Sequence, residues 1–242
     1  MTARAIILAA GRGSRMDALT YDRPKCLVEV RGKPLLQWQL DALRGCGLKE
    51  IAIVTGYCRE MIALPALIEF HNPRWMDTNI LASLACAGDW LRQGPCVVTY
   101  SDIFYEGSAV QSLRDCDAPL AIAYALHWRA LWERRFVDPL TDAETLRLHP
   151  DGTLAEIGNR PATLDAIEGQ YMGLLRLDPA GWAEVARIRR ALCPAEQDRM
   201  DMTNALQRVI AAGRVAVTAV PYEGEWGEVD SPRDLALYEA RP

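Results

Sequence analysis

A glycine-rich loop with basic residues follows a short apolar segment near the start of the chain. After Leu8 and Ala10 come Gly11, Gly13, Ser14 and Arg15, and then Lys25. Because glycine has no Cβ, backbone N–H groups in such a loop can approach phosphate oxygens closely. Arg15 offers a forked guanidinium and Lys25 a point charge for the same phosphates. The residue types and their spacing therefore predict a phosphate-binding site.

Two other kinds of phosphate loop fit this stretch less well. A P-loop ends in Gly-Lys followed by Ser or Thr, and Gly13-Ser14-Arg15 does not provide that ending. A dinucleotide-binding loop needs a small residue where Met16 stands and then a crossover helix, whose apolar period is missing here. Glu29 lies near the position of a ribose-binding acid, so a nicotinamide-dependent oxidoreductase stays open as an alternative. A simple turn at the end of a strand is the purely structural interpretation.

Acidic residues stand at two further positions where a ligand could bind. Asp102 follows the apolar segment 96–100, at the carboxyl end of an expected buried strand, the edge where open α/β sheets bind ligands. Glu228 and Asp230 come just before Ser231, where the last helix is expected to start. Either aspartate could instead be an ordinary loop or capping residue, and Asp230 could serve only the helix N-terminus.

Aromatic and basic side chains gather between residues 127 and 146. Trp128, Trp132 and Arg135 stand out, because aromatic faces beside guanidinium groups suit a phosphorylated organic molecule. The arginines would take the phosphate, and a tryptophan would cover the organic part or an ammonium group. The structural alternative is an amphipathic helix whose two tryptophans, one turn apart, pack on the core.

Apolar segments of strand length alternate with segments of helical period, which is typical of a parallel sheet covered by helices. Strands are expected at 5–9, 50–55, 66–70, 96–100, 120–126, 171–177 and 215–221, and helices at 33–46, 80–91, 180–192, 202–212 and from Ser231. The start signal at Ser231 is strong, because a proline and an acid follow the capping serine. Residues 144–157 alternate around Pro150-Asp151-Gly152 and predict a hairpin. We expect a single α/β domain, residues 1–242, with a small β-rich insertion.

The composition narrows the class of protein. The chain has 242 residues, 50% of them hydrophobic, and a formal net charge of −5. This length suits about one large domain, and 27 basic against 32 acidic residues leave no positive excess for a nucleic-acid backbone. No apolar segment approaches the roughly 18–20 residues that a transmembrane helix needs. Seven cysteines without a Cys-x-x-Cys pair and the lack of a signal-peptide pattern predict a cytoplasmic protein with reduced thiols.

The N-terminal loop resembles the signature of the nucleotidyltransferases that activate small phosphorylated molecules. It reads Ala5-Ile6-Ile7-Leu8-Ala9-Ala10-Gly11-x-Gly13-Ser14-Arg15-Met16, followed by Pro24-Lys25-Cys26-Leu27. That superfamily includes sugar-phosphate nucleotidyltransferases and the choline-phosphate cytidylyltransferases of bacterial surface-glycan pathways. Its members transfer a nucleoside monophosphate from an NTP to a phosphate-bearing acceptor and release pyrophosphate. The resemblance implies a Rossmann-like, mixed but mostly parallel sheet flanked by helices.

The resemblance also implies which residues bind the nucleotide. Those in the loop are Leu8, Ala10, Gly11, Gly13 and Ser14, beside the catalytic Arg15 and Lys25. Residues 72–84 are similar to choline-phosphate and phosphoglutamine cytidylyltransferases, which implies CTP. Thr78 and Asn79 then lie near the pyrimidine, where a side-chain amide can read the edge of cytosine. They can also cap the helix that starts at Ile80, and both roles can hold together.

The expected acceptor-binding portion spans about residues 125–178. Residues 132–144 and 167–173 are similar to the phosphoglutamine-type cytidylyltransferases of capsule modification. The acceptor contacts that this similarity implies are Trp128, Trp132, Arg135, Glu168 and Tyr171, with Glu168 able to pair with an amine. The implied acceptor is a small phosphoglutamine-, phosphocholine- or phosphonate-like molecule. A homodimer is compatible with these expectations.

A magnesium ion is implied as well. In the superfamily, an acid at the end of the central strand and another in a motif near the end of the domain jointly hold Mg²⁺. Asp102 matches the first position and Asp230 the second, and Glu228-Val229-Asp230 is called the late motif. Glu228 is a candidate substitute. Mg²⁺ prefers oxygen ligands and usually binds one or two carboxylates plus substrate phosphates. The implied reaction is an in-line attack of an acceptor phosphate oxygen on the α-phosphorus of CTP, without a strong general base.

Two other functions stay open. One is a nucleotidyltransferase that acts on a sugar 1-phosphate with dTTP, UTP or GTP, although the chain lacks the Pro-x-Gly-Leu-Ala segment usual in many such enzymes. The other is a non-catalytic, nucleotide-binding regulator with the same fold. The joint presence of Arg15, Lys25, Asp102 and Asp230 favours an enzyme, because binding alone does not need both carboxylates.

Overall fold

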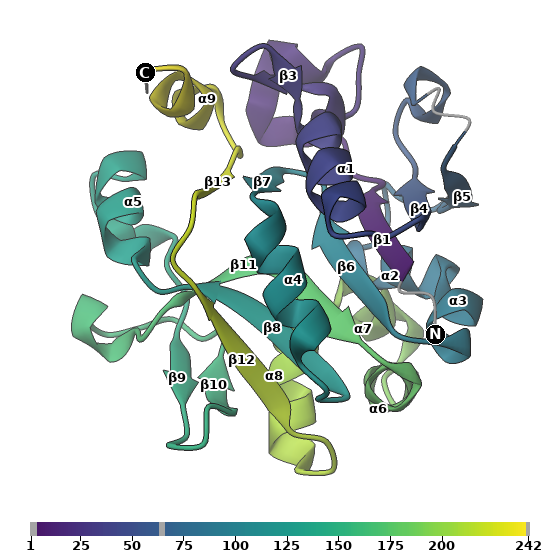
Figure 1. Cartoon of the computed structure of the whole chain (residues 1–242), viewed down its shortest axis with the longest axis vertical. Coiled ribbons are helices and arrows are strands. Elements are labelled where there is room, and N and C mark those ends of the chain that lie inside the picture. Colours follow the sequence, from purple (N-terminus) through teal and green to yellow (C-terminus); the bar gives the residue numbers. More distant parts are fainter. Residues whose placement is uncertain (1–3, 63–65, 241–242) are drawn as a thin grey trace.

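A seven-stranded sheet forms the centre of the protein in the computed structural model, which describes residues 4–62 and 66–240 (Figure 1). Its order is β12 (Val217–Tyr222), β8 (Leu120–Ala125), β11 (Gln170–Leu177), β6 (Cys96–Tyr100), β1 (Arg4–Ala9), β4 (Glu50–Thr55) and β5 (Ile68–His71). Strand β11 is antiparallel to both of its neighbours, and the other neighbouring pairs are parallel. The mixed, mostly parallel, Rossmann-like sheet predicted from the sequence is confirmed.

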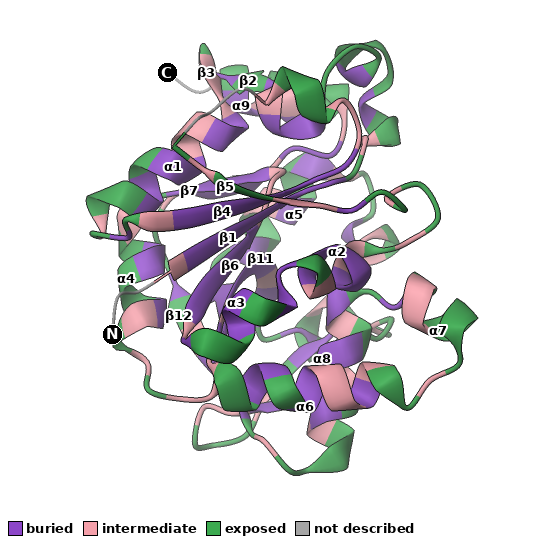
Figure 2. Ribbon diagram, turned by 90° about the vertical axis from the view of Figure 1, so that its right-hand side faces the viewer, coloured by how far each residue is buried: buried purple, intermediate pink, exposed green. Residues whose placement is uncertain are grey.

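Helices cover both faces of this sheet, and the strands between them are buried (Figure 2). One face carries α2 (Ile80–Cys86), α3 (Gly88–Gln93), α6 (Pro179–Arg190) and α8 (Met202–Ala212), and the other carries α1 (Leu35–Gly45), α4 (Gly107–Asp115) and α5 (Trp128–Arg135). Side chains along β1 supply both cores, because successive residues of a strand point to opposite faces. Ile6 and Leu8 belong to the first cluster, and Ala5 and Ile7 to the second.

A smaller apolar cluster lies at the edge of the sheet where the functional residues gather. It joins α9 (Pro232–Glu239), the 3-10 segment Ser14–Thr20 and the hairpin of β2 (Glu29–Val30) and β3 (Lys33–Pro34). Beside it, β7 (Ile103–Tyr105) pairs antiparallel with β13 (Trp226–Glu228). The Oγ of Ser231 accepts a hydrogen bond from the Asp234 N–H at 3.2 Å, so the capping signal that predicts α9 is confirmed.

Some elements differ from those expected. The helix predicted at 80–91 is two helices, α2 and α3, which meet at Ala87, and the apolar period on either side of that residue hides the break. Strands β7 and β13 have three residues each, too few for an alternating pattern to show. The predicted hairpin is confirmed as β9 (Leu146–Leu148) and β10 (Leu154–Ile157). Among the described residues, no helix has the length and apolar character needed to cross a lipid bilayer.

Candidate active site

Strand β1 brings the glycine-rich loop to the carboxyl edge of the sheet. The N–H of Tyr57 donates to the carbonyl of Ala10 at 3.0 Å and holds the start of the loop. Gly13 adopts a left-handed conformation, with φ 71° and ψ 54°, and the hydroxyl of Thr20 donates to its carbonyl at 3.1 Å. A Cβ built at Gly11 would meet no described atom within 4 Å. The backbone at Gly11 is therefore open to a ligand.

The turn between β6 and β7 places Asp102. Gln39, fully buried in α1, donates from Nε2 to the carbonyls of Tyr100 at 2.9 Å and Ile103 at 2.7 Å, one on each side of the turn. The N–H of Val229 donates to the carbonyl of Asp102 at 2.9 Å. Because β7 also pairs with β13, the turn that carries Asp102 and the late motif are held against each other.

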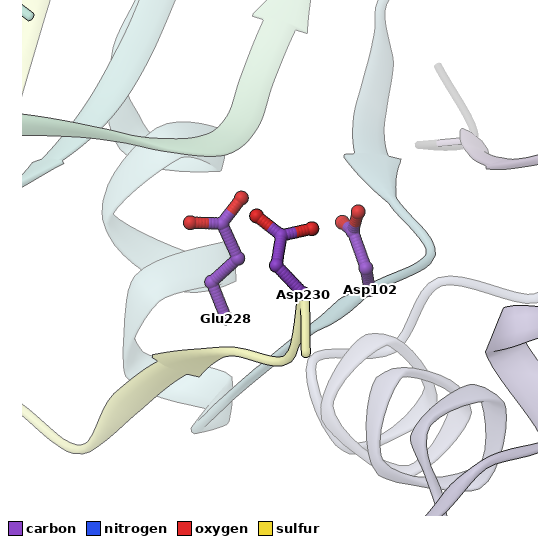
Figure 3. Close-up of side chains that lie close together, drawn as sticks. All are labelled: Asp102, Glu228 and Asp230. Atoms are coloured by element: carbon purple, nitrogen blue, oxygen red, sulfur yellow. The ribbon is translucent and has the colours of Figure 1, made fainter. Parts of the chain in front are cut away.

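Three carboxylates meet at this point, those of Asp102, Glu228 and Asp230 (Figure 3). One oxygen from each lies within 4.8 Å of the others. Within the described part of the chain, Oδ1 of Asp102 is buried and has no hydrogen-bond partner. An unsatisfied buried acceptor costs free energy unless a ligand completes it. These residues fit a cation that prefers oxygen ligands, such as Mg²⁺.

Two basic residues of the loop reach the same cluster. Nζ of Lys25 lies 2.9 Å from Oδ2 of Asp102 and 2.5 Å from Oδ1 of Asp230. Nη2 of Arg15 lies 2.9 Å from the same Asp230 oxygen. A Cβ at Gly13 would come within 2.7 Å of Cδ of Lys25, so the lysine stem passes directly against this glycine. The expected cations and the expected carboxylates therefore share one site.

Burial and charge act against each other on these groups. Burial lowers the pKa of Lys25, but the carboxylates of Asp102 and Asp230 outweigh it, so the net shift is upward. Burial likewise raises the pKa of Asp230, and Lys25 reverses this to a net lowering. For Glu228, burial and then the charge of Asp230 raise the pKa to about 8. Lys25 is therefore cationic and Asp230 ionised at neutral pH.

Two cavities open on the cluster. The first, of about 310 Å³, is called the loop cavity, and its lining includes Leu8, Ala10, Gly11, Gly13, Ser14, Arg15, Lys25, Thr78 and Asn79. The second, of about 340 Å³, is called the acidic cavity, and its lining includes Trp132, Asp142, Glu144, Gln170, Tyr171, Asp201, Glu228 and Asp230. Both linings include Arg15, Tyr100 and Asp102. A ligand in either cavity would end at the carboxylate cluster.

The start of α2 forms one wall of the loop cavity. Oδ1 of Asn79 accepts from the Ile80 N–H at 2.7 Å, so the predicted helix cap is confirmed. Asn72 is buried and donates from Nδ2 to the hydroxyls of Thr78 and Ser83, each at 3.0 Å. The asparagine therefore ties the turn before the helix to the helix itself.

The acidic cavity places carboxylates beside aromatic rings. Burial raises the pKa of Asp142, and burial followed by the charge of Asp201 raises the pKa of Glu144. The rings of Tyr100 and Tyr171 meet edge to face, with centroids 5.8 Å apart. This lining combines negative charge with aromatic faces, a combination that suits an organic cation.

Comparison with known proteins identifies the family. The model of the MobA-like NTP transferase domain matches residues 5–166, more than half of the chain. The chain belongs to this family. It is also 35% identical to CTP:phosphoglutamine cytidylyltransferase of Campylobacter jejuni, over 96% of this chain and 98% of that protein. The nucleotidyltransferase class predicted from the sequence is thereby confirmed.

Other relatives of this NTP transferase are similar over shorter stretches or in fold alone. The 2-aminoethylphosphonate cytidylyltransferase of Lancefieldella rimae is 35% identical over 41% of this chain and 42% of that protein. The structure of CTP:phosphocholine cytidylyltransferase from Streptococcus pneumoniae superposes with a TM-score of 0.75 at 21% identity, over 99% of this chain and 98% of that one. The structure of the inositol-1-phosphate CTP transferase from T. maritima superposes with a TM-score of 0.78 at 18% identity, over 99% of this chain and 94% of that one.

The residues expected to bind the acceptor separate into two groups in this NTP transferase. Trp132 and Tyr171 line the acidic cavity. Trp128, Arg135 and Glu168 do not contribute to its described lining, so their contact with an acceptor stays a prediction. Trp128 packs into the core beside Trp132, as the helix alternative predicts, with 4% and 3% of these residues exposed.

Glu168 and Arg135 have partners within the protein. Oε2 of Glu168 accepts from the N–H of Leu148 at 2.7 Å and holds the hairpin. Arg135 is buried among the acids of the late motif, bonded to Glu228 and Asp234. The resemblance implied acceptor contacts for both side chains, and that role stays a prediction beside these partners within the protein.

Several cavity residues were missed from the sequence. They are Trp75 and Ser83 in the loop cavity and Asp142, Glu144, Gln170, Asp201 and Thr203 in the acidic cavity. Asp142 and Glu144 stand in the motif 132–144, where the tryptophans and arginines drew attention instead. Asp201 carries a recognisable signal as the N-cap of α8, because its Oδ1 accepts from the Asn204 N–H at 2.7 Å. That signal indicates a helix, however, and not a ligand.

Proposed function

We propose that this transferase moves CMP from CTP to a small phosphate- or phosphonate-bearing acceptor that carries an amine, releasing pyrophosphate with Mg²⁺ as cofactor. The observation that carries the proposal is the meeting of two cavities at Arg15, Tyr100 and Asp102, beside the carboxylate cluster. A nucleotide in the loop cavity and an acceptor in the acidic cavity would present their phosphates to this shared wall. Holding two reactants in this way makes their reaction effectively unimolecular.

The loop cavity suits the nucleotide. Backbone N–H groups from Gly11 to Arg15, with the Arg15 side chain, would bind the departing pyrophosphate. Lys25 would stabilise the charge that develops on the α-phosphate, and its raised pKa keeps it cationic at neutral pH. The choice of CTP follows the relatives whose names specify CTP or a cytidylyltransferase.

The carboxylate cluster suits Mg²⁺. Asp102 and Asp230 would hold it, with Glu228 as a further oxygen donor. Bound Mg²⁺ neutralises phosphate charge and orients the phosphates that it contacts. The nucleophile is a phosphate or phosphonate oxygen that is already anionic, so the side chains have to position it and not to remove a proton.

The acidic cavity suits an amine at the far end of the acceptor. Asp142, Glu144 and Asp201 offer carboxylates, and Trp132 and Tyr171 offer aromatic faces. The acceptor phosphate would lie at the opposite end, at the wall that this cavity shares with the loop cavity. An aminophosphonate is named for one relative and a phosphorylated amino acid for another. The product would be the acceptor joined to CMP, an activated form that could be transferred to a surface glycan.

A pyrophosphate-release screen tests this proposal. It crosses CTP, UTP, dTTP, GTP and ATP with phosphocholine, phosphorylated amino acids, aminoalkylphosphonates and sugar 1-phosphates. We expect release with CTP and an amine-bearing acceptor. Release only with a sugar 1-phosphate would replace the acceptor class, and no release with any pair would favour a nucleotide-binding regulator.

One variant tests the amine contact. Asp201→Asn removes the carboxylate charge and keeps the side-chain oxygen that caps α8. We expect the KM for the amine-bearing acceptor to rise about tenfold, since a hydrogen bond to a charged group contributes about 1.5 kcal/mol. Asp178→Asn is the matched control, because Asp178 caps α6 in the same way and lies outside both cavity linings. Equal KM values in the two variants would remove Asp201 from the acceptor site.

A further inference from the structure

Arg135 carries a buried charge that the proposed reaction does not use. Its side chain stands at the end of α5 and is 0% exposed, and the described linings of the two cavities do not include it. Burying a charge is costly unless partners compensate it. The partners of Arg135 therefore indicate its role.

Three acidic residues, two of the late motif and one of α9, surround the Arg135 guanidinium. Its Nε donates to Oδ1 of Asp234 and its Nη1 donates to Oε2 of Glu228, each at 2.9 Å. Its Nη2 lies 3.7 Å from Oδ2 of Asp230. One rigid, planar group thus faces Glu228, Asp230 and Asp234 at once, which the single ammonium of a lysine cannot reproduce.

Asp234 extends this contact to the main chain. While its Oδ1 accepts from Arg135, its Oδ2 accepts from the N–H groups of Asp230 at 3.0 Å and Ser231 at 2.9 Å. Arg135 therefore holds the side chain of Glu228 directly and the backbone at Asp230 through Asp234. The second oxygen of Asp230, Oδ1, is left facing Lys25.

Aromatic rings hold the guanidinium in place. Cζ of Arg135 lies 5.0 Å from the ring centroid of Trp132 and 5.1 Å from that of Phe136, within the range of cation–π attraction. Trp132 also lines the acidic cavity. Helix α5 thus contributes one wall of that cavity and, through Arg135, the support of two carboxylates.

We propose that Arg135 is a positioning residue for the metal site: it orients Glu228 and Asp230 so that, with Asp102, they bind a divalent cation. This inference rests on the proposed function, in which these carboxylates hold Mg²⁺. Charge alone has the opposite effect, because a nearby guanidinium repels a cation. A positioning role therefore makes metal binding depend on the fork of hydrogen bonds and not on the charge.

Arg135→Lys separates these two effects, because it keeps the charge and removes the fork. We expect the affinity of the free protein for Mn²⁺ to fall about tenfold, as for other groups that orient metal ligands. The EPR signal of unbound Mn²⁺ measures this affinity. Arg134→Lys is the matched control, since Arg134 is exposed on the same helix and forms no ion pair with a carboxylate of the described residues. Its Mn²⁺ affinity should equal that of the wild type.

Unchanged or tighter Mn²⁺ binding by Arg135→Lys would overturn the proposal, even with a lower Tm, because a merely structural role lowers Tm alone. If that variant does not fold, Asp234→Asn replaces it. An amide has one acceptor oxygen where the carboxylate has two, so it cannot serve both Arg135 and the backbone, and the same loss is expected. Mn²⁺ binding requires no turnover. A failed acceptor screen would therefore refute the proposed function and still leave this comparison decisive.

Discussion

At the scale of single residues, Lys25 occupies the centre of the site. Its ammonium lies between Asp102 and Asp230, so two carboxylates that would repel each other share one buried positive charge. Removing one member of such a group leaves the others charged without compensation. Gly13 lies directly against the lysine stem, so the loop sets the path that the side chain takes. The chemistry of the loop and the charge balance of the cluster therefore depend on the same residue.

Lys25→Ala should reduce turnover strongly. Loss of a group that stabilises charge in the transition state costs about 10²–10³-fold in kcat, and pyrophosphate release measures it. Lys33→Ala is the control, because Lys33 forms an ion pair with Asp41 away from both cavity linings. Near-normal turnover in Lys25→Ala would remove this lysine from the mechanism.

Gly13→Ala should impair the site by a steric route. A Cβ there would lie 2.7 Å from Cδ of Lys25 and would displace the lysine, whereas Gly213 has a similar φ of 62° and open space around it. Both alanine variants should lose about 1 kcal/mol of stability from the left-handed backbone. Only Gly13→Ala should also lose turnover, measured beside thermal melting. Equal turnover in both variants would show that the contact with Lys25 has no consequence.

At the scale of elements, short pairings far from each other in the sequence assemble the site. The pairing of β7 with β13 places Glu228 opposite Ile103 and so brings the late motif to Asp102. A second connection lies at the opposite end of the sheet. There Glu184 of α6 accepts two hydrogen bonds from Arg187, at 2.8 and 2.6 Å, and lies 3.5 Å from Arg214, which precedes β12. This contact links helix α6 to the segment that leads into strand β12.

Glu184→Gln should destabilise the protein in a pH-dependent way. Hydrogen bonds from Arg187 lower the pKa of Glu184 in the folded protein. The stabilisation is therefore complete above the ordinary glutamate pKa of about 4.3 and is lost as pH falls through the lower folded value. Because 39% of the Arg187 side chain and 64% of the Arg214 side chain are exposed, solvent screening limits the effect to about 1 kcal/mol. In urea unfolding the difference from the wild type should be full at pH 7 and should shrink as the pH falls below about 4.

Asp89→Asn provides the comparison for this experiment. Asp89 also lies three residues before an arginine, but 80% of its side chain is exposed. An ion pair this open to water contributes little to stability. A difference for Glu184→Gln that does not shrink as the pH falls below about 4 would show that its charge is not the cause.

At the scale of the whole molecule, the sheet brings the loop cavity and the acidic cavity to one edge. The strands that bound this edge, β1 and β6, are parallel neighbours from the first half of the chain. Strand β11, between β6 and β8, joins the portion expected to bind the acceptor to the same sheet. The carboxylates at the junction are balanced by Lys25, Arg15 and Arg135 from the chain itself. The fold at the site therefore does not depend on a metal for its charge balance.

Removal of metal should stop the reaction and spare the fold. With EDTA and without CTP, Tm should shift by less than about 2 °C, which for a chain of this size is under about 1 kcal/mol. Pyrophosphate release should fall to background under the same conditions and return with added Mg²⁺. A larger loss of Tm would mean that the chain's own cations do not compensate the carboxylates.

Much of the fold follows from local patterns. The uninterrupted apolar run from Ala5 to Ala9 predicts a strand buried on both faces, and the two core clusters show that burial. Ser231 and Asp201 carry capping signals that need only a few neighbouring residues. The break at Ala87 and the three-residue strands β7 and β13 have no such signal, because they form only through packing and pairing with distant elements.

Residue types at short spacing sufficed to predict the loop, the capped helices and the strand pattern, whereas the pairing of Asp102 with Asp230 came from the resemblance to the nucleotidyltransferases. The contacts of the charged side chains in the insertion became clear from the tertiary fold alone. Arg135 turns to Glu228 and Asp234, and Asp142 and Glu144 reach the cavity in its place. The physical reason is that a buried charge needs a compensating partner, and that partner is brought by elements distant in the sequence.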